Sequence, residues 1–209
     1  MLLSSAYLPP VWYFTKLAMS DGQEVWIEQW DSYMKQTFRN RCVIGGADGP
    51  LVLTVPTEKT DKPKVLMRDV RISDHGEWRR QHWHALEAAY GQTPYFLYYE
   101  DDFRPFYEQR HAFLYDYNLQ LMALCCELID IHPHLRRTDA WAATADDDFR
   151  AVISPKNSPD RDSAFRPAPY WQVFADRFGF RANLSIVDML FNMGPESIFV
   201  LKQSIVPTE

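Results

Sequence analysis

A length of 209 residues is typical of one domain with a single core, and a hydrophobic content of 46%, with 15% aromatic residues, excludes a disordered chain. The formal net charge of −6 at pH 7 argues against a nucleic-acid partner, because phosphate binding requires an excess of Lys and Arg. Three cysteines, two of them adjacent at Cys125 and Cys126, are typical of a reducing compartment rather than of a disulfide-rich secreted domain.

The start of the chain has a pattern that predicts a β-α-β unit. Residues 2–5 predict a short strand, residues 7–10 a turn, residues 12–19 a helix and residues 24–28 a second strand. Elements in this order usually build a parallel sheet through a right-handed crossover.

The same N-terminal stretch is apolar, but it is not typical of a signal peptide. It lacks a basic n-region and contains Pro9, Pro10 and Lys16. No run in the chain reaches the roughly 18 apolar residues of a membrane-spanning helix. We therefore expect a cytoplasmic protein without a transmembrane segment.

A β-hairpin is predicted next, with a row of cations on its first strand. Residues 33–44 and 51–55 read as strands around a glycine-rich turn, and residues 65–72 offer one more strand. Side chains alternate along a strand, so Lys35, Arg39 and Arg41 would share a face. Such a row is either an anion site for phosphate or carboxylate, or a solvated face paired with Asp and Glu.

Residues 77–90 predict an amphipathic helix with a buried histidine. His82 falls on the apolar arc beside Arg79, whereas His84 falls on the polar side, so the two cannot share a metal ion. Burial next to a positive charge could tune His82 as a general base. The alternative is a core histidine whose hydrogen bonds are satisfied internally.

Residues 103–131 predict a long helix that places Arg110 at the centre of its buried stripe and Asn118 at the rim. A buried guanidinium needs either an internal carboxylate or a bound anion. Residues 138–169 read as a long polar loop that carries Lys156. Two helical segments, residues 170–178 and 186–193, follow it.

Together these elements predict a single α/β (or α+β) domain over residues 1–209. An N-terminal β-α-β unit and a hairpin would form a mixed sheet, and the second half would be predominantly helical. The chain contains no G-x-S-x-G elbow, Walker loop, H-E-x-x-H or paired C-x-x-C. No metal site is predicted, and no cofactor is indicated.

Several separated motifs resemble the bacterial WbqC-like family, in the family's order and over nearly the whole chain. The motifs are Tyr7-Leu8-Pro9, Lys35-Gln36-Thr37, Arg39-Asn40-Arg41, the run from Trp78 to Trp83, Ser154-Pro155-Lys156, and Asn183-Leu184-Ser185-Ile186 through Asn192-Met193-Gly194-Pro195. Family members are often encoded among genes for O-antigen and other surface polysaccharides. The resemblance therefore implies modification of a nucleotide-activated or lipid-linked sugar.

Our leading hypothesis is a transferase that acts on an activated amino sugar, with a small anionic ligand such as a nucleotide sugar as its partner. His82 would be the catalytic base. The residues assigned to substrate or anion binding are Lys35, Arg39, Arg41, Arg79, Tyr7, Asn118, Lys156 and Asn183. A non-catalytic binding or scaffolding protein of a polysaccharide-assembly system is the alternative. Nucleotidyl transfer, with a nucleotide at the Tyr7 loop, is a third possibility.

Overall fold

The structure, a computed structural model, describes residues 1–61 and 63–207 of the chain. Three short 3-10 turns (Met67–Asp69, Pro159–Arg161 and Gly194–Glu196) accompany the strands and α-helices. The strands and α-helices are, in chain order, β1 (Leu2–Ser4), α1 (Val11–Met19), β2 (Glu24–Glu28), β3 (Arg41–Ile44), β4 (Leu51–Thr54), α2 (Trp78–Tyr90), α3 (Phe96–Glu108), α4 (Leu114–Ile129), β5 (His134–Arg137), α5 (Ala175–Phe178), α6 (Ile186–Met193) and α7 (Ser197–Gln203).

Three parallel strands form one sheet in the order β1-β2-β5, so β2 is the central strand. The predicted β-α-β unit is confirmed, because β1 and β2 pair in parallel and α1 connects them. Pro10 precedes α1, where a proline is tolerated because the first helical N–H groups have no intrahelical partner. The sequence analysis missed β5, whose Leu135 lies opposite Val25 in the register.

The antiparallel hairpin of β3 and β4 completes the mixed α/β fold. Gly49, with a φ of 115°, occupies a conformation in its turn that side chains with a Cβ rarely adopt.

The predicted strand over residues 33–44 is wrong before Arg41, because the chain makes a turn there instead. The Thr37 hydroxyl donates to the carbonyl of Met34 at 2.8 Å, and Gln36 has a left-handed φ of 62°. A side chain that bonds nearby backbone in this way competes with a strand.

The predicted strand over residues 65–72 is also wrong. This segment forms the 3-10 turn Met67–Asp69, flanked by isolated bridges. The backbone N–H of Met67 bonds the carbonyl of Asp31 at 2.8 Å, and that of Arg68 bonds Gln29 at 3.0 Å. The segment therefore pairs with irregular backbone after β2 rather than with a sheet.

The single helix predicted over residues 103–131 is in fact two helices, α3 and α4. The chain between them is held away from helical geometry, because Phe113 makes a bridge with Arg71 and the N–H of Leu114 bonds Val70 at 2.9 Å. Arg110 consequently lies in the connection, with 82% of its side chain exposed, and faces Asp74 at 3.5 Å. The prediction that Arg110 is buried at the centre of a stripe is wrong.

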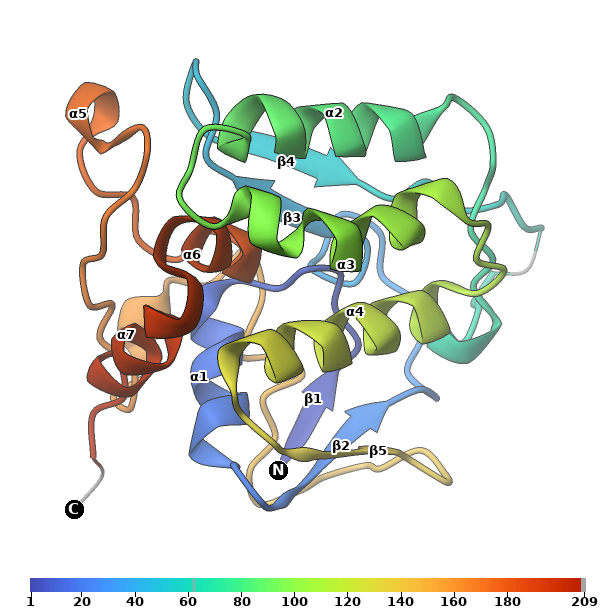
Figure 1. The fold of residues 1–209 in the computed structure, drawn as a ribbon. Helices are drawn as coiled ribbons and strands as arrows, with labels where there is room; N and C mark the ends of the chain where they lie inside the picture. Colours follow the sequence, from blue (N-terminus) through green and yellow to red (C-terminus); the bar gives the residue numbers. More distant parts are fainter. Residues whose placement is uncertain (62, 208–209) are drawn as a thin grey trace.

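The second half is predominantly helical, as predicted, and α6 forms its centre. Helix α6 contacts α1, α2, α3 and α4, while α2, α3 and α4 lie one below another in Figure 1. A helix that is apolar around its circumference is expected at such a position. Its one charged residue, Asp188, is buried and accepts hydrogen bonds from the hydroxyls of Tyr90 at 2.8 Å and Tyr170 at 2.7 Å.

Residues 138–169 run along the outside of the parallel sheet without strands or α-helices and contain only the 3-10 turn Pro159–Arg161 (Figure 1). The segment is tied to the N-terminal unit at Asp162, whose carboxylate lies 2.5 Å from the buried Nζ of Lys16. No helix among the described residues is both long and apolar enough to cross a membrane.

Candidate functional site

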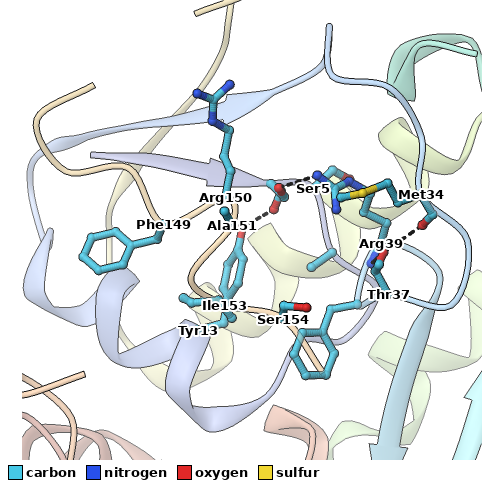
Figure 2. Close-up of a pocket in the computed structure, with 13 residues that line it drawn as sticks. Ser5, Tyr13, Met34, Thr37, Arg39, Phe149, Arg150, Ala151, Ile153 and Ser154 are labelled. Carbon is cyan, nitrogen blue, oxygen red and sulfur yellow. Dashed lines mark hydrogen bonds between the residues drawn. The ribbon is translucent and has the colours of Figure 1, made fainter. Parts of the chain in front are cut away.

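A cavity of about 170 Å³ lies where β1 ends, at the carboxyl edge of the parallel strands. Ligands of open α/β sheets commonly bind outside this edge. Figure 2 shows the side chains around the cavity, which come from the end of β1, from α1, from the turn before β3 and from the 149–154 segment. The lining residues are Ser4, Ser5, Ala6, Tyr13, Met34, Thr37, Phe38, Arg39, Phe149, Arg150, Ala151, Ile153 and Ser154. We call this the sheet-edge cavity.

Arg39 is the charged side chain in this wall that retains free hydrogen-bonding capacity. Its Nη2 donates to Ser4 Oγ at 2.9 Å and lies 3.4 Å from a carboxylate oxygen of Asp31. Among the described residues, the hydrogen bonds of its guanidinium all come from Nη2, and no group bonds its Nε or Nη1. Burial lowers the pKa of Arg39, although the nearby Asp31 raises it. A guanidinium remains protonated under these conditions and offers a planar pair of donors to an anion.

Behind the cavity, a network of charges joins the strand ends to the 138–154 segment. Arg150 bonds Asp148 at 2.6 Å, Glu28 at 3.2 Å and Asp31 at 3.5 Å. The hydrogen bond from Arg150 holds the pKa of Asp148 below its usual range. In Figure 2 the guanidinium of Arg150 points away from Thr37 and Ser154, so only the stem of this side chain faces the cavity.

Glu28, the last residue of β2, has a side chain with 0% exposure and anchors this network. One carboxylate oxygen accepts from the N–H of Trp30 at 2.7 Å and from the Thr138 hydroxyl at 2.9 Å. The other accepts from Arg150 at 3.2 Å and from the N–H of Ala142 at 3.3 Å. Because the donors come from Trp30, Thr138, Arg150 and Ala142, this buried carboxylate fixes the loops around the cavity.

A second, more open hollow of about 440 Å³ adjoins the sheet-edge cavity. It is lined by Trp30, Asp31, Ser32, Met34, Arg39 and Trp141. The two spaces share Met34 and Arg39, so the guanidinium lies at their junction. Trp141 is 61% exposed, and its indole N–H lies 3.3 Å from Asp31. A ligand at this junction can therefore place an anionic group at Arg39, hydroxyls at the polar side chains of the wall, and a ring against the face of Trp141.

His82 lines neither of these two spaces, because it faces the aromatic core. Its Nδ1 is 2.9 Å from the Tyr7 hydroxyl, which is in turn 3.0 Å from the hydroxyl of Tyr107. The backbone of Thr54 makes a further hydrogen bond with the ring, and burial lowers the pKa of His82 to about 4. This geometry corresponds to the alternative of a core histidine with internally satisfied hydrogen bonds. The catalytic role of His82 stays a prediction.

The three predicted cations do not converge on one space. Arg39 lies at the sheet-edge cavity, whereas Lys35 lines a separate cavity with Tyr33. Arg41 is half-buried at the start of β3 and lies near enough to lower the pKa of Tyr33. The strand alternation that grouped them does not apply, because the turn at residues 34–37 redirects the chain.

Two of the other predicted residues support the wall of the cavity or the helix behind it. The side-chain amide of Asn118 donates to Ser5 Oγ at 3.0 Å and to the carbonyl of Arg39 at 2.8 Å. Asn183 accepts the N–H of Trp12 at 2.9 Å and thus caps the start of α1 from a distant part of the chain. Asn118 and Asn183 would therefore affect a ligand only indirectly, by holding the cavity wall and the start of α1 in place.

The remaining predicted residues lie away from the junction. Tyr7 is fully buried with His82, and Arg79 bonds Asp74 at 2.6 Å while its guanidinium lies over the ring of Trp78 at 4.8 Å. Lys156 is exposed in a turn two residues after Ser154, which does line the cavity. None of the three lines the sheet-edge cavity or the hollow beside it.

Sequence reasoning missed Glu28, Asp31, Asp148, Arg150 and Trp141. A usable signal was present for two of them, since Glu28 ends a correctly predicted parallel strand and Asp31 follows three residues later. Polar residues directly after parallel strands meet at the ligand-binding edge of a sheet. Arg150 carried no such signal, because it lies within an irregular segment 122 positions away from Glu28.

Comparison with known proteins gives one family and one uncharacterised relative. A model of the WbqC-like protein family matches residues 4–158, which include every residue of the sheet-edge cavity and of the adjoining hollow. An uncharacterised protein of Mycobacterium tuberculosis, Rv1507c, is 24% identical over 222 aligned residues that cover 94% of each chain. No solved structure matches.

Proposed function

Because the chain belongs to the WbqC-like protein family, we propose that it is a transferase that acts on an activated amino sugar in surface-polysaccharide biosynthesis. The substrate would bind at the junction of the sheet-edge cavity and the adjoining hollow. The observation that carries the proposal is the guanidinium of Arg39, which is buried at this junction with two of its nitrogens unbonded by the described residues. The genes near which family members are often encoded supply the choice of substrate class.

Each part of such a substrate has a matching group at the junction. The free edge of Arg39 fits a phosphate oxygen pair, since guanidinium donors match phosphate geometry. The exposed indole of Trp141 offers a face to a sugar ring. Ser5, Thr37 and Ser154 line the sheet-edge cavity with hydroxyls that can hydrogen-bond the hydroxyls of the sugar.

We assign proton transfer to Asp31 rather than to His82, since Asp31 lines the hollow and its side chain is 21% exposed. In the transfer step a hydroxyl or amine of the sugar forms the new bond to the transferred group. Its proton passes to the carboxylate of Asp31, and the leaving group of the donor departs with the electron pair of the broken bond. The donor is a second substrate that supplies the transferred group.

Calorimetric titration with UDP-N-acetylglucosamine, used as a nucleotide-activated amino sugar, tests the binding step. We expect Arg39→Gln to weaken binding by about tenfold or more, because a charge-assisted hydrogen bond to phosphate is lost. Arg80→Gln, which removes an exposed guanidinium from α2, is the matched control and should bind as wild type does. Equal binding by a folded Arg39→Gln variant would contradict the proposal.

The alternative of a non-catalytic binding protein is favoured by one observation, the exposure of large apolar side chains on α3. Leu97 is 70% exposed and Tyr98 is 77% exposed on adjacent positions. Asp31→Asn separates the two functions. A transferase should retain ligand binding and lose turnover in this variant, whereas in a scaffolding protein no substrate is turned over by the wild type either.

A further inference from the structure

Lys35 lines a different cavity, of about 230 Å³, on the other side of the turn before β3. Its wall consists of Tyr33, Lys35, Thr57, Glu58, Lys59, Thr60, Val65, Asp69, Val70 and Arg71. We propose that this basic cavity is a second anion-binding site, which takes a small phosphorylated metabolite. The inference does not depend on the transferase proposal, because the basic cavity shares no lining residue with the sheet-edge cavity.

The walls of the basic cavity are held by backbone hydrogen bonds. The N–H of Tyr33 bonds the carbonyl of Val65 at 2.8 Å, which fixes one wall. The N–H of Glu58 bonds the carbonyl of Arg71 at 3.0 Å, which fixes a second part of the wall. The cavity is therefore formed by the fold before any ligand arrives, which lowers the ordering cost of binding.

The charges around the basic cavity leave a positive excess. Glu58 is 3.5 Å from Arg71, and Asp69 is 3.7 Å from Arg68, so each carboxylate has a guanidinium partner. Lys35 and Lys59 make no ion pair with any residue that the structure describes. Both lysines are exposed, so their ammonium groups are free to contact an anion that enters the cavity.

The aromatic hydroxyl of Tyr33 adds a neutral donor to this cavity. Burial raises the pKa of Tyr33, so the group is protonated at neutral pH, and its buried hydroxyl oxygen has no hydrogen-bond partner among the described residues. Next to Lys35, Gln36 is held at a φ of 62°, which costs an ordinary residue free energy. The turn keeps that conformation through the Thr37 hydroxyl bond to Met34, and it thereby directs Lys35 to the basic cavity.

Phosphate fits this arrangement better than a carboxylate does. Ammonium groups act as point charges without the fork geometry that matches a carboxylate, and a phosphate dianion satisfies two of them at once. A volume of about 230 Å³ lies below the range of pockets for larger ligands, so a small metabolite is expected. The ligand class is therefore a phosphate ester of a small molecule.

Calorimetric titrations with inorganic phosphate, glucose 6-phosphate and succinate test the inference. We expect wild type to bind glucose 6-phosphate most tightly, and Lys35→Gln with Lys59→Gln to weaken that binding about a hundredfold, at about tenfold per lost ammonium contact. Lys202→Gln, on the distant helix α7, is the control for general charge loss. Thermal unfolding of each variant confirms that it is folded.

Two results would overturn the inference. One is equal binding of glucose 6-phosphate by wild type and the folded double variant, and the other is binding of succinate as tight as that of the phosphate ester. Arg39→Gln separates this site from the sheet-edge cavity. It should keep its affinity for glucose 6-phosphate, even if it loses affinity for the nucleotide sugar.

Discussion

Acidification should destabilise the protein through His82 in a defined pH range. The ring is buried between the Tyr7 hydroxyl, 2.9 Å from Nδ1, and the backbone of Thr54. In the neutral tautomer that fits both contacts, Nδ1 accepts the hydroxyl hydrogen and the ring N–H faces the Thr54 carbonyl. Protonation of Nδ1 would require the Tyr7 hydroxyl to accept instead of donate, and it would bury a positive charge among aromatic rings.

The size of the effect follows from the pKa. Burial lowers the pKa of His82 from 6.5 to about 4, and each factor of ten in an equilibrium constant is worth about 1.4 kcal/mol, so protonation costs roughly 3 kcal/mol of unfolding free energy. The folded pKa lies below the unfolded one. This contribution is therefore complete above pH 6.5 and is lost as the pH falls to about 4.

Urea unfolding at pH 7, 5.5 and 4.5, compared between wild type and His82→Gln, measures this contribution. Carboxylates that titrate in the same range act on both proteins, so the difference between them isolates the imidazole. His84→Gln removes an exposed histidine from the same helix and should keep the wild-type pH dependence. The reasoning is refuted if wild type and His82→Gln lose stability in parallel, or if the His82 ring titrates near pH 6.5 by NMR.

Two further substitutions should change stability in opposite directions. Asp162→Ala leaves the fully buried ammonium of Lys16 without its carboxylate 2.5 Å away, and urea unfolding should show a loss of about 3–5 kcal/mol; Asp160→Ala, in the exposed part of the same segment, is the control. Asp130→Gly, at the end of α4 where φ is 62°, should raise the melting temperature, because glycine relieves about 0.5–1 kcal/mol of left-handed strain; an unchanged or lower melting temperature would contradict this.

The sequence predicted those elements whose cause is local. The strand over residues 24–28 and the helix over residues 186–193 have the predicted bounds, because period-2 and period-3.6 patterns of apolar residues with suitable flanking residues define them. The arc that buries His82 was also correct, since His82 and Trp78 are both buried on α2. Helical periodicity thus predicted burial well, but burial alone did not distinguish a base from a core residue.

Errors occurred where long-range pairing decides the structure. Residues 65–72 have a β-branched composition, yet their backbone groups bond Gln29 and Asp31 in an irregular segment. The break between α3 and α4 depends on the bridge of Phe113 with Arg71, 42 positions away by their residue numbers. Neither partner can be identified from a local pattern, because propensity is a weak prior that tertiary contacts override.

The candidate site shows the same division between local and long-range information. Arg39 was selected from the sequence for its charge, and it does border a cavity, although not as part of a strand. Its surroundings depend on Glu28 and Arg150, which are brought together across 122 positions by the pairing of β2 with β5 and the path of the segment that follows. The sequence analysis therefore missed strand β5 and the ion network for the same reason, since both depend on this long-range pairing.

The separation of Lys35 from Arg39 also changes what their charges imply. On one strand face, like charges would repel, and the sequence analysis offered either a bound anion or pairing with Asp and Glu to offset that repulsion. The turn at residues 34–37 removes the repulsion by directing Arg39 to Ser4 and Asp31 and directing Lys35 to the basic cavity. Arg39 then has the carboxylate of Asp31 at 3.4 Å, whereas Lys35 makes no ion pair among the described residues, because Glu58 and Asp69 in its cavity pair with Arg71 and Arg68. Lys35 therefore depends more on an external anion than Arg39 does. Although the two residues are only four positions apart, they lie at two separate cavities, which two anion sites account for better than one shared site.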